Sequence, residues 1–198
     1  MKILSFDVGM KNLAFILFDC NDNNLNIINW DIINLVDAKI KCKDINLIDI
    51  GKNINKLFHI YFKEQDFDKI LIENQIGNNA IRMKCVQCMI SQWFIDNNFN
   101  NIEYISSSHK LNFVAKMYDL KDIIKDLDYK KKKKMAILII KSLLKENKNN
   151  FDELYINFFN ENKKKDDLSD CFLQGYYYIK KNNLFKNNLI IDAYDLKL

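Results

Sequence analysis

Two short segments far apart in the chain have nearly the same pattern, KILSFD at residues 2–7 and KILIEN at residues 69–74. Each begins with a lysine, continues through an apolar run typical of a buried β-strand, and stops at an acid, Asp7 or Glu73. An acid at the end of a buried strand costs free energy unless it is paired or bound to a cation. The two segments therefore predict two buried strands and two carboxylates that need a positive partner.

The other apolar patterns predict consecutive strands followed by strands that alternate with helices. Strands are expected at 2–8, 13–19, 25–36, 68–74 and 101–107, and helices at 45–62, 80–95, 130–144 and 166–181. We interpret the charged segment 119–128 as a lid or connector, and residues 184–198 give no clear signal. This order favours an α/β fold, with helices packed on a mixed sheet, and predicts a single domain over residues 1–198.

Composition narrows the setting in which such a chain works. At 48% hydrophobic residues the chain can bury a core, and its longest apolar stretches, such as residues 135–140, are too short to span a bilayer. The acid in the first apolar segment argues against a signal peptide, and five cysteines without framework spacing favour a reducing compartment. We therefore expect an intracellular protein that does not contact membranes, and we interpret the lone CxxC at residues 85–88 as two helical thiols rather than a zinc site.

Acids gather again at the start of the last expected helix, in KKKDDLSDCF at residues 163–172. At about 100° per residue, the apolar positions form one stripe that should face the core: Leu168, Phe172, Gly175 and Ile179. Asp167 and Asp170 form the adjacent stripe, one turn apart, whereas Asp166 is expected to be an N-cap. Because the helix dipole also stabilises acids in a first turn, a purely structural role for the pair stays open.

Asp7, Glu73, Asp167 and Asp170 are four carboxylates with no evident cationic partner in their own segments. Magnesium prefers carboxylate oxygens and keeps positions for water and substrate phosphates. Two such ions can activate an attacking water and stabilise the leaving oxygen of a phosphodiester. The sequence therefore predicts a site for two Mg2+ ions, which Mn2+ can replace, in an enzyme that hydrolyses phosphodiesters.

Four motifs in order, FDVGMKNLAF, ILIENQ, SSSHK and KKDDLSDCFLQG, resemble the RuvC-type Holliday junction resolvases, above all the poxvirus-type enzymes and their mitochondrial yeast relatives. The resemblance covers residues 2–181 and implies the RNase H-like (retroviral integrase superfamily) fold, a mixed five-stranded sheet with helices on both faces. It also implies a magnesium-dependent, structure-selective DNA endonuclease without a nucleotide cofactor. Such an enzyme acts as a homodimer on branched DNA, cutting four-way junctions symmetrically. For a poxvirus-like chain, the resemblance further implies concatemer resolution at cytoplasmic replication sites or in the virion.

Carried over residue by residue, the resemblance assigns the metal to Asp7, Glu73, Asp167 and Asp170. Lys110, in SSSHK, would lie near the scissile phosphate and act in catalysis, and one lysine of the block 130–134 is a second candidate for that contact.

Further residues are expected to contact the DNA backbone. They lie in the turn after Asp7, at the start of the helix after Glu73, and in the basic block: Lys11, Asn12, Gln75, Asn78, Asn79, Arg82, Lys130, Lys131, Lys132, Lys133 and Lys134. Amides and a cation at a helix N-terminus are natural phosphate contacts, although a plain hairpin turn, helix capping and a merely solvated basic face are the structural alternatives. If the block binds DNA, affinity should fall steeply with salt. The helix at 80–95 is the expected dimer surface.

Three other functions fit parts of the pattern. A nucleotide phosphotransferase also places DxG after a first strand, but the four glycines, at 9, 51, 77 and 175, provide no second phosphate loop. A non-catalytic junction-binding protein of the same fold is disfavoured because a pure binder gains by losing acids near phosphates. A related nuclease that cuts other branched DNA or RNA/DNA hybrids stays open, since a metal site does not report substrate shape.

Overall fold

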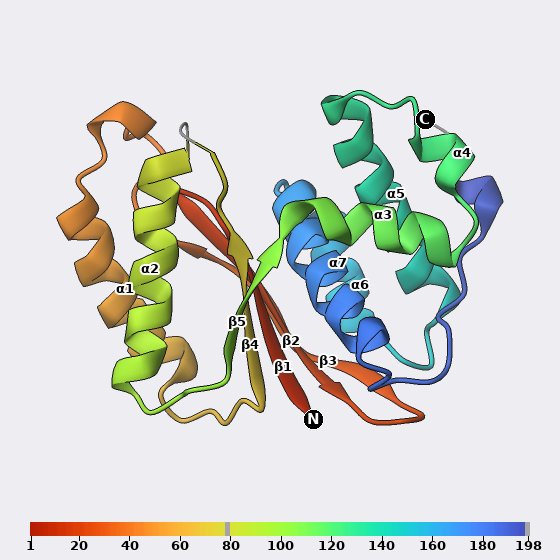
Figure 1. Ribbon diagram of the computed structural model, residues 1–198, viewed down its shortest axis with the longest axis horizontal. Helices are drawn as coiled ribbons and strands as arrows, with labels where there is room; N and C mark the ends of the chain where they lie inside the picture. Colours follow the sequence, from red (N-terminus) through yellow and green to blue (C-terminus); the bar gives the residue numbers. More distant parts are fainter. Residues whose placement is uncertain (78–79, 197–198) are drawn as a thin grey trace.

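The computed structural model describes residues 1–77 and 80–196 (Figure 1). Its strands are β1 (Lys2–Val8), β2 (Asn12–Cys20), β3 (Leu25–Asn34), β4 (Lys69–Asn74) and β5 (Ile102–Ser106). Its α-helices are α1 (Leu47–Phe62), α2 (Ile81–Asp96), α3 (Ser107–Met117), α4 (Lys121–Ile124), α5 (Tyr129–Glu146), α6 (Glu153–Glu161) and α7 (Lys165–Lys181). Two short 3-10 turns are η1 (Cys42–Asp44) and η3 (Ala193–Asp195).

The five strands form one mixed sheet in the order β3-β2-β1-β4-β5. β1, β2 and β3 are antiparallel neighbours, whereas β4 runs parallel to both β1 and β5. Parallel pairing requires a crossover, and the described chain makes these crossovers through α1 and α2. The meander followed by alternating strands and helices is as the sequence predicted.

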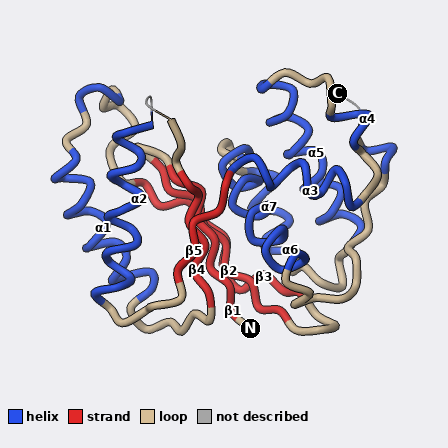
Figure 2. Tube along the Cα trace, in the orientation of Figure 1, coloured by secondary structure: helices blue, strands red, loops and turns tan. Residues whose placement is uncertain are grey.

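Helices cover both faces of the sheet (Figures 1 and 2). One face packs against α1 and α2 through a core rich in aromatic rings, with Phe6 of β1 stacked on Phe58 of α1 at a ring separation of 5.7 Å. The other face packs against α7, around which α3, α5 and α6 gather. This arrangement confirms the predicted α/β class and the helices on both faces.

Gly175 lets α7 lie directly on the sheet. A Cβ at this position would stand 2.7 Å from a ring carbon of Phe18 in β2 and 3.3 Å from the Cβ of Ser5 in β1. The helix therefore approaches the sheet closely at this position, where the nearest group is a phenyl ring rather than backbone. The four residues of the predicted core stripe are all buried.

The structure also differs from the sequence-based expectations. Two helices, α3 and α6, were not predicted, and the segment 119–128 contains the short helix α4, whose Ile124 is buried, so this connector is packed against the protein. The prediction that Asp166 caps α7 is wrong, because the helix begins one residue earlier and Lys164 occupies the N-cap position. The tail after α7 returns along α5, where the Asn147 side chain bonds both the backbone N–H and the carbonyl of Ile190.

Across the described residues, no helix combines the length and apolar character needed to cross a membrane. All five cysteines are free thiols, including the CxxC pair, whose Cys88 is exposed on α2.

Candidate active site

The candidate site lies where the strand order changes direction. From β1 the chain builds outward through β2 and β3, and then returns to add β4 and β5 on the other side. Open α/β sheets bind ligands at such a switch point, outside the carboxyl ends of the strands. Asp7 and Glu73 stand at the ends of the two strands that flank it, in a register that pairs Phe6 with Ile72. Since Phe6 and Ile72 face α1 and α2, alternation directs both acids toward α7.

Helix α7 brings its acids to the same place because hydrogen bonds tie it to β1. The Ser5 hydroxyl donates to the carbonyl of Cys171 at 2.9 Å. The Gln174 amide donates to the Ser5 hydroxyl at 3.1 Å and to a β1 carbonyl at 3.0 Å. The N-terminal turns of α7 are thereby fixed beside the end of β1, and Asp167 and Asp170 line one cleft with Asp7 and Glu73.

Lys110 occupies the centre of this acidic group. It comes from the first turns of α3, directly after β5, and only 3% of its side chain is exposed. Its ammonium group lies 3.0 Å from Glu73 Oε1 and 3.5 Å from Asp7 Oδ1. The Gln75 amide donates to the second oxygen of Glu73 at 2.9 Å, so both oxygens of that carboxylate have a partner.

Burial and mutual repulsion shift the titration of the acids. Burial raises the pKa of Asp7 well above its usual value, the negative charges of Glu73 and Asp170 add to the rise, and Lys110 only partly opposes it. Burial also acts to raise the pKa of Glu73, but Lys110 and the hydrogen bonds of its neighbours hold that pKa below its usual value. Burial raises the pKa of Asp170 as well. Added positive charge would relieve this repulsion, as expected of a cation site.

The outer part of the cleft carries more lysines. Lys133 of α5 lies 3.1 Å from Asp166 and 3.9 Å from Asp170, and Lys164 lies 3.7 Å from Asp167. These pairs are partly exposed, so each contributes little to stability. They do place ammonium groups within reach of a phosphate that enters the cleft.

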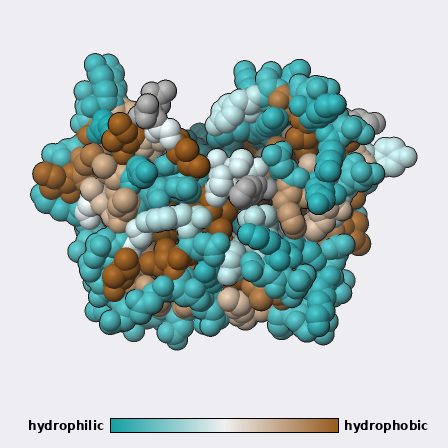
Figure 3. Space-filling model, viewed as in Figure 1, coloured by the Kyte–Doolittle hydropathy of each residue, from teal (hydrophilic) through white to brown (hydrophobic). Residues whose placement is uncertain are grey.

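The cleft has a volume of about 780 Å³ and opens between the α1–α2 side and the α3–α7 side of the molecule. A notch is visible there in the space-filling view (Figure 3). Its lining combines the four acids and Lys110 with a polar and basic rim: Lys11, Asn12, Cys42, Gln75, Ser107, Ser108, Asn112, Tyr129, Lys132, Lys133 and Lys164.

The donor chemistry of the cleft fits a hard divalent cation, since carboxylate oxygens are the ligands that Mg2+ and Mn2+ prefer. In the described residues, however, no three of the four carboxylates bring their oxygens within 4.8 Å of one another. The Lys110 ammonium stands against two of them instead. A bound cation would therefore compete with Lys110 for Asp7 and Glu73.

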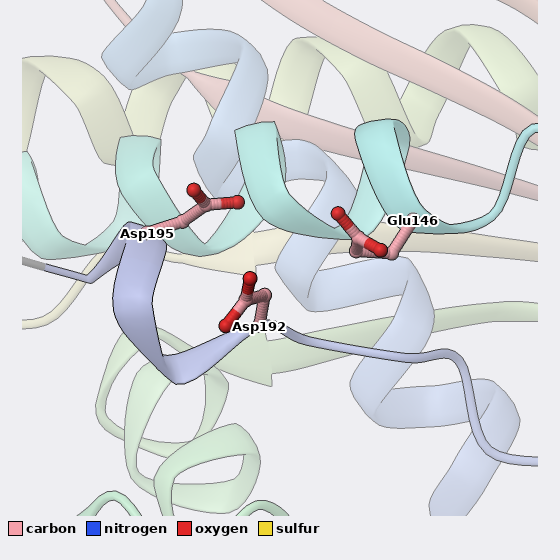
Figure 4. Close-up of side chains that lie close together, drawn as sticks. All are labelled: Glu146, Asp192 and Asp195. Carbon is pink, nitrogen blue, oxygen red and sulfur yellow. The ribbon is translucent and has the colours of Figure 1, made fainter.

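A tighter acidic group lies elsewhere and is already paired. The carboxylates of Glu146, Asp192 and Asp195 do fall within 4.8 Å of one another (Figure 4). Lys145 pairs with Asp195 at 2.9 Å and with Glu146 at 3.4 Å, which holds the C-terminal turn against α5. This group lines no part of the cleft.

The predicted DNA contacts lie in different places relative to the cleft. Lys11, Asn12, Gln75, Lys132 and Lys133 line the cleft, while Lys130, Lys131 and Lys134 are exposed on the same first turns of α5 but outside its lining. Gln75 is 9% exposed and its side chain bonds Glu73, and Arg82 donates to backbone carbonyls, so neither side chain points freely into solvent. Asn78 and Asn79 lie outside the described residues.

Several polar residues of the cleft were missed as site candidates: Cys42, Ser107, Ser108, Asn112, Tyr129 and Lys164. Lys164 belongs to the lysine run that directly precedes the α7 acids, so its position in the sequence could have identified it. Tyr129 and Cys42 carry no comparable signal, because their approach to the cleft depends on long-range packing.

No model of a known protein family matches the chain. An uncharacterised protein of Acanthamoeba polyphaga mimivirus is 31% identical over 142 residues, which are 65% of this chain and 32% of that relative. The chain thus spans about a third of the length of the curated relative that it matches.

Two solved structures resemble the whole architecture. The fowlpox virus resolvase in complex with Holliday junction DNA matches with a TM-score of 0.61 and 17% identity, over 92% of this chain and 99% of that one. The yeast mitochondrial Holliday junction resolvase matches with a TM-score of 0.63 and 18% identity, over 92% of this chain and 81% of that one. At such identities the likeness concerns the fold, and the chain has the RNase H-like fold of these resolvases.

Proposed function

We propose that this chain is a divalent-metal-dependent, structure-selective DNA endonuclease that resolves four-way junctions by paired, symmetric phosphodiester hydrolysis. The observation that carries the proposal is the convergence of Asp7, Glu73, Asp167 and Asp170 with Lys110 in one lysine-rimmed cleft. The fold supports it, since the fowlpox protein with that fold is a resolvase described with Holliday junction DNA.

The four carboxylates would hold two Mg2+ ions, or Mn2+ in their place. Bound metal supplies an activated water for in-line attack and positive charge for the leaving oxygen. The remaining roles belong to the residues of the chain. Gln75 orients Glu73 through its 2.9 Å hydrogen bond, and the burial of Lys110 keeps its charge from being screened by solvent.

Lys110 would contact the scissile phosphate. Its ammonium lies beside two of the acids that would hold the metal, so a phosphate placed at those acids would come within its reach. Lys132, Lys133 and Lys164 at the rim would bind neighbouring phosphates and orient the strand. The expected products carry 5′-phosphate and 3′-hydroxyl ends.

Two symmetric cuts require two sites related by a two-fold axis, which a homodimer provides with one site on each subunit. In a virus, the natural substrate would be the branched intermediates of replicating genomes, within a reducing intracellular compartment. The mimivirus relative is compatible with such an origin.

The test is cleavage of an end-labelled four-way junction and of a linear duplex of matched sequence, each with Mg2+ and with chelator. The expected result is symmetric nicks in the junction alone, present only with metal. Asp7→Asn should abolish cleavage, whereas Asp49→Asn, at an exposed acid on α1 with a surface partner, should cut like the wild type. Cleavage that persists in chelator, or in Asp7→Asn, would overturn the proposed site.

One observation favours a second function, a junction-binding protein without nuclease activity. The ion pairs of Lys110 give Asp7 and Glu73 a cationic partner without any metal. Intact junctions bound tightly in Mg2+ would support this alternative. Cleavage of flaps or RNA/DNA hybrids in preference to junctions would instead indicate a related nuclease with another substrate.

A further inference from the structure

A lysine-bearing segment forms part of the cleft on the side opposite α5. Residues 37–45 connect β3 to α1 and include η1, and Cys42 of this segment lines the cleft. Lys39, Lys41 and Lys43 follow one another at alternate positions, and all three are exposed. Figure 1 shows the segment above α1, at the same end of the molecule as the start of α5 and on the other side of the sheet.

The segment is fixed by cations that bind its backbone. The Arg82 guanidinium, from the first turn of α2, donates to the carbonyl of Cys42 at 2.9 Å, to that of Lys43 at 3.3 Å, and to that of Ile45. The Lys11 ammonium donates to the carbonyl of Ala38 at 2.8 Å. Buried Ile45 anchors the end of the segment in the core against α1 and α2.

In this segment the backbone carbonyls and the lysine side chains have different surroundings. The carbonyls turn toward Arg82 and Lys11, whereas the side chains of Lys39, Lys41 and Lys43 stay in solvent. The planar guanidinium suits this task because its several N–H donors reach three acceptors at once, which a single ammonium group does not do equally well.

We infer that Lys39, Lys41 and Lys43, which are exposed beside the cleft and outside its lining, form a second phosphate-binding wall along its rim. Arg82 is then a positioning residue that acts on DNA only through this segment. The inference rests on the proposed function and specifies its DNA interface. DNA held between this wall and the α5 lysines would present phosphates to both sides, with the acids between them.

The charge of the three lysines determines how much the salt dependence of DNA binding should change when they are removed. Each phosphate neutralised by a lysine contributes about 0.9 to the slope of log affinity against log salt for duplex DNA. Three lysine contacts therefore account for a slope of up to about 3. Loss of the wall should lower the affinity and flatten the salt dependence without touching the acids or Lys110.

The experiment measures junction affinity over a range of KCl concentrations in chelator, where the proposed nuclease cannot cut. The triple variant Lys39→Gln, Lys41→Gln, Lys43→Gln should bind more weakly, with a slope smaller by about 2–3. Lys52→Gln, at an α1 lysine that is 74% exposed, is the matched control and should keep the wild-type slope. All variants should unfold near the wild-type temperature, because the substituted side chains lie in solvent.

Arg82→Lys distinguishes positioning from direct contact. If Arg82 itself bound a phosphate, the lysine would keep the charge and most of the affinity. If it positions the segment, Arg82→Lys should weaken junction binding in the same direction as the triple variant, while the thermal unfolding temperature checks that the protein is folded.

The thiol of Cys42 provides an independent readout. Junction DNA should protect the exposed Cys42 from maleimide, relative to the same protein without DNA. Arg82→Lys should reduce the protection.

A wild-type chain that binds junctions, together with an unchanged salt slope in the triple variant and an unprotected Cys42, would overturn the second wall and leave the proposed function standing. Wild-type affinity in Arg82→Lys would overturn the positioning role. A wild-type chain that neither binds nor cuts junctions would overturn both the inference and the proposed function.

Discussion

Replacing Lys110 by methionine removes the cation that stands between Asp7 and Glu73 and keeps a side chain of similar length. The Lys110 side chain is 3% exposed, and its ammonium lies 3.0 Å from Glu73 and 3.5 Å from Asp7. Removing one partner of a buried ion pair costs about 3–5 kcal/mol, because the other charge stays buried without compensation. For a chain of this size, 1 kcal/mol shifts the unfolding temperature by about 2–4 °C. In chelator, Lys110→Met should therefore unfold on the order of 10 °C below the wild type.

Divalent metal should reduce the difference in unfolding temperature between Lys110→Met and the wild type. A cation bound to the same carboxylates supplies the charge that the substitution removes, and a ligand stabilises the folded state more as its affinity rises. Lys110→Met should therefore gain more thermal stability from Mg2+ than the wild type does. It should nevertheless cleave junctions about 10²–10³-fold more slowly, which is the usual loss when a donor that stabilises negative charge in the transition state is removed.

The assay is thermal unfolding followed by circular dichroism in chelator and in millimolar Mg2+, with cleavage rates measured in parallel. Lys116→Met, at an exposed lysine on the same helix α3, is the control and should match the wild type in every condition. A Lys110→Met variant that is as stable as the wild type in chelator, or that gains no more than the wild type from Mg2+, would refute the competition between lysine and metal.

The remaining predictions concern other parts of the same site. Because burial raises the pKa of Asp7 in the folded state, the folded protein binds a proton at Asp7 more tightly than the unfolded chain does. The stability that this group contributes therefore falls as pH rises from its unfolded pKa through its folded pKa. Without metal, Asp7→Asn should flatten the decline in unfolding temperature toward higher pH, and an unchanged decline would exclude Asp7 as its source. Gly175→Ala places a Cβ 2.7 Å from the Phe18 ring. This overpacking, partly offset by better helix propensity, should destabilise the protein by about 1–2 kcal/mol, as measured by urea unfolding. The variant should also cleave more slowly at temperatures where it is fully folded. Gln75→Met removes the hydrogen bond to Glu73 and should weaken metal affinity about 10–100-fold, measured by calorimetric titration with Mn2+; unchanged affinity would exclude an orienting role.

The strands and the last helix could be predicted because local pattern and tertiary environment agree there. β1 and β4 are central strands of the sheet, so their apolar runs match their burial on both faces. The stripe of α7 faces the sheet as its period indicates. The same reasoning predicts the positions of Asp7 and Glu73, since the strand that carries each acid fixes where its short side chain can lie.

The missed helices have weaker local signals. α3 begins with polar residues, two serines followed by a histidine and a lysine, and continues directly from β5, so the sequence marks no boundary between strand and helix. α6 has nine residues, of which only Phe159 is buried. Such short helices depend on tertiary packing for most of their stability, and the ring of Phe159 stacks on Trp30 of β3 at 5.1 Å, far away in the sequence.

The acids of the site were easier to predict than its cations for a physical reason. Neighbouring strands lie about 4.8 Å apart, so short carboxylates at the ends of two paired strands must meet once the pairing is known. The side chains of lysine and arginine are long and flexible, and their charge can lie on either side of their own backbone. Arg82 illustrates this, because the sequence places it at a helix start near the proposed site, yet its guanidinium turns to the backbone of residues 42–45. The charge of such a residue can therefore be assigned to phosphate only after the acceptors nearest to it have been identified.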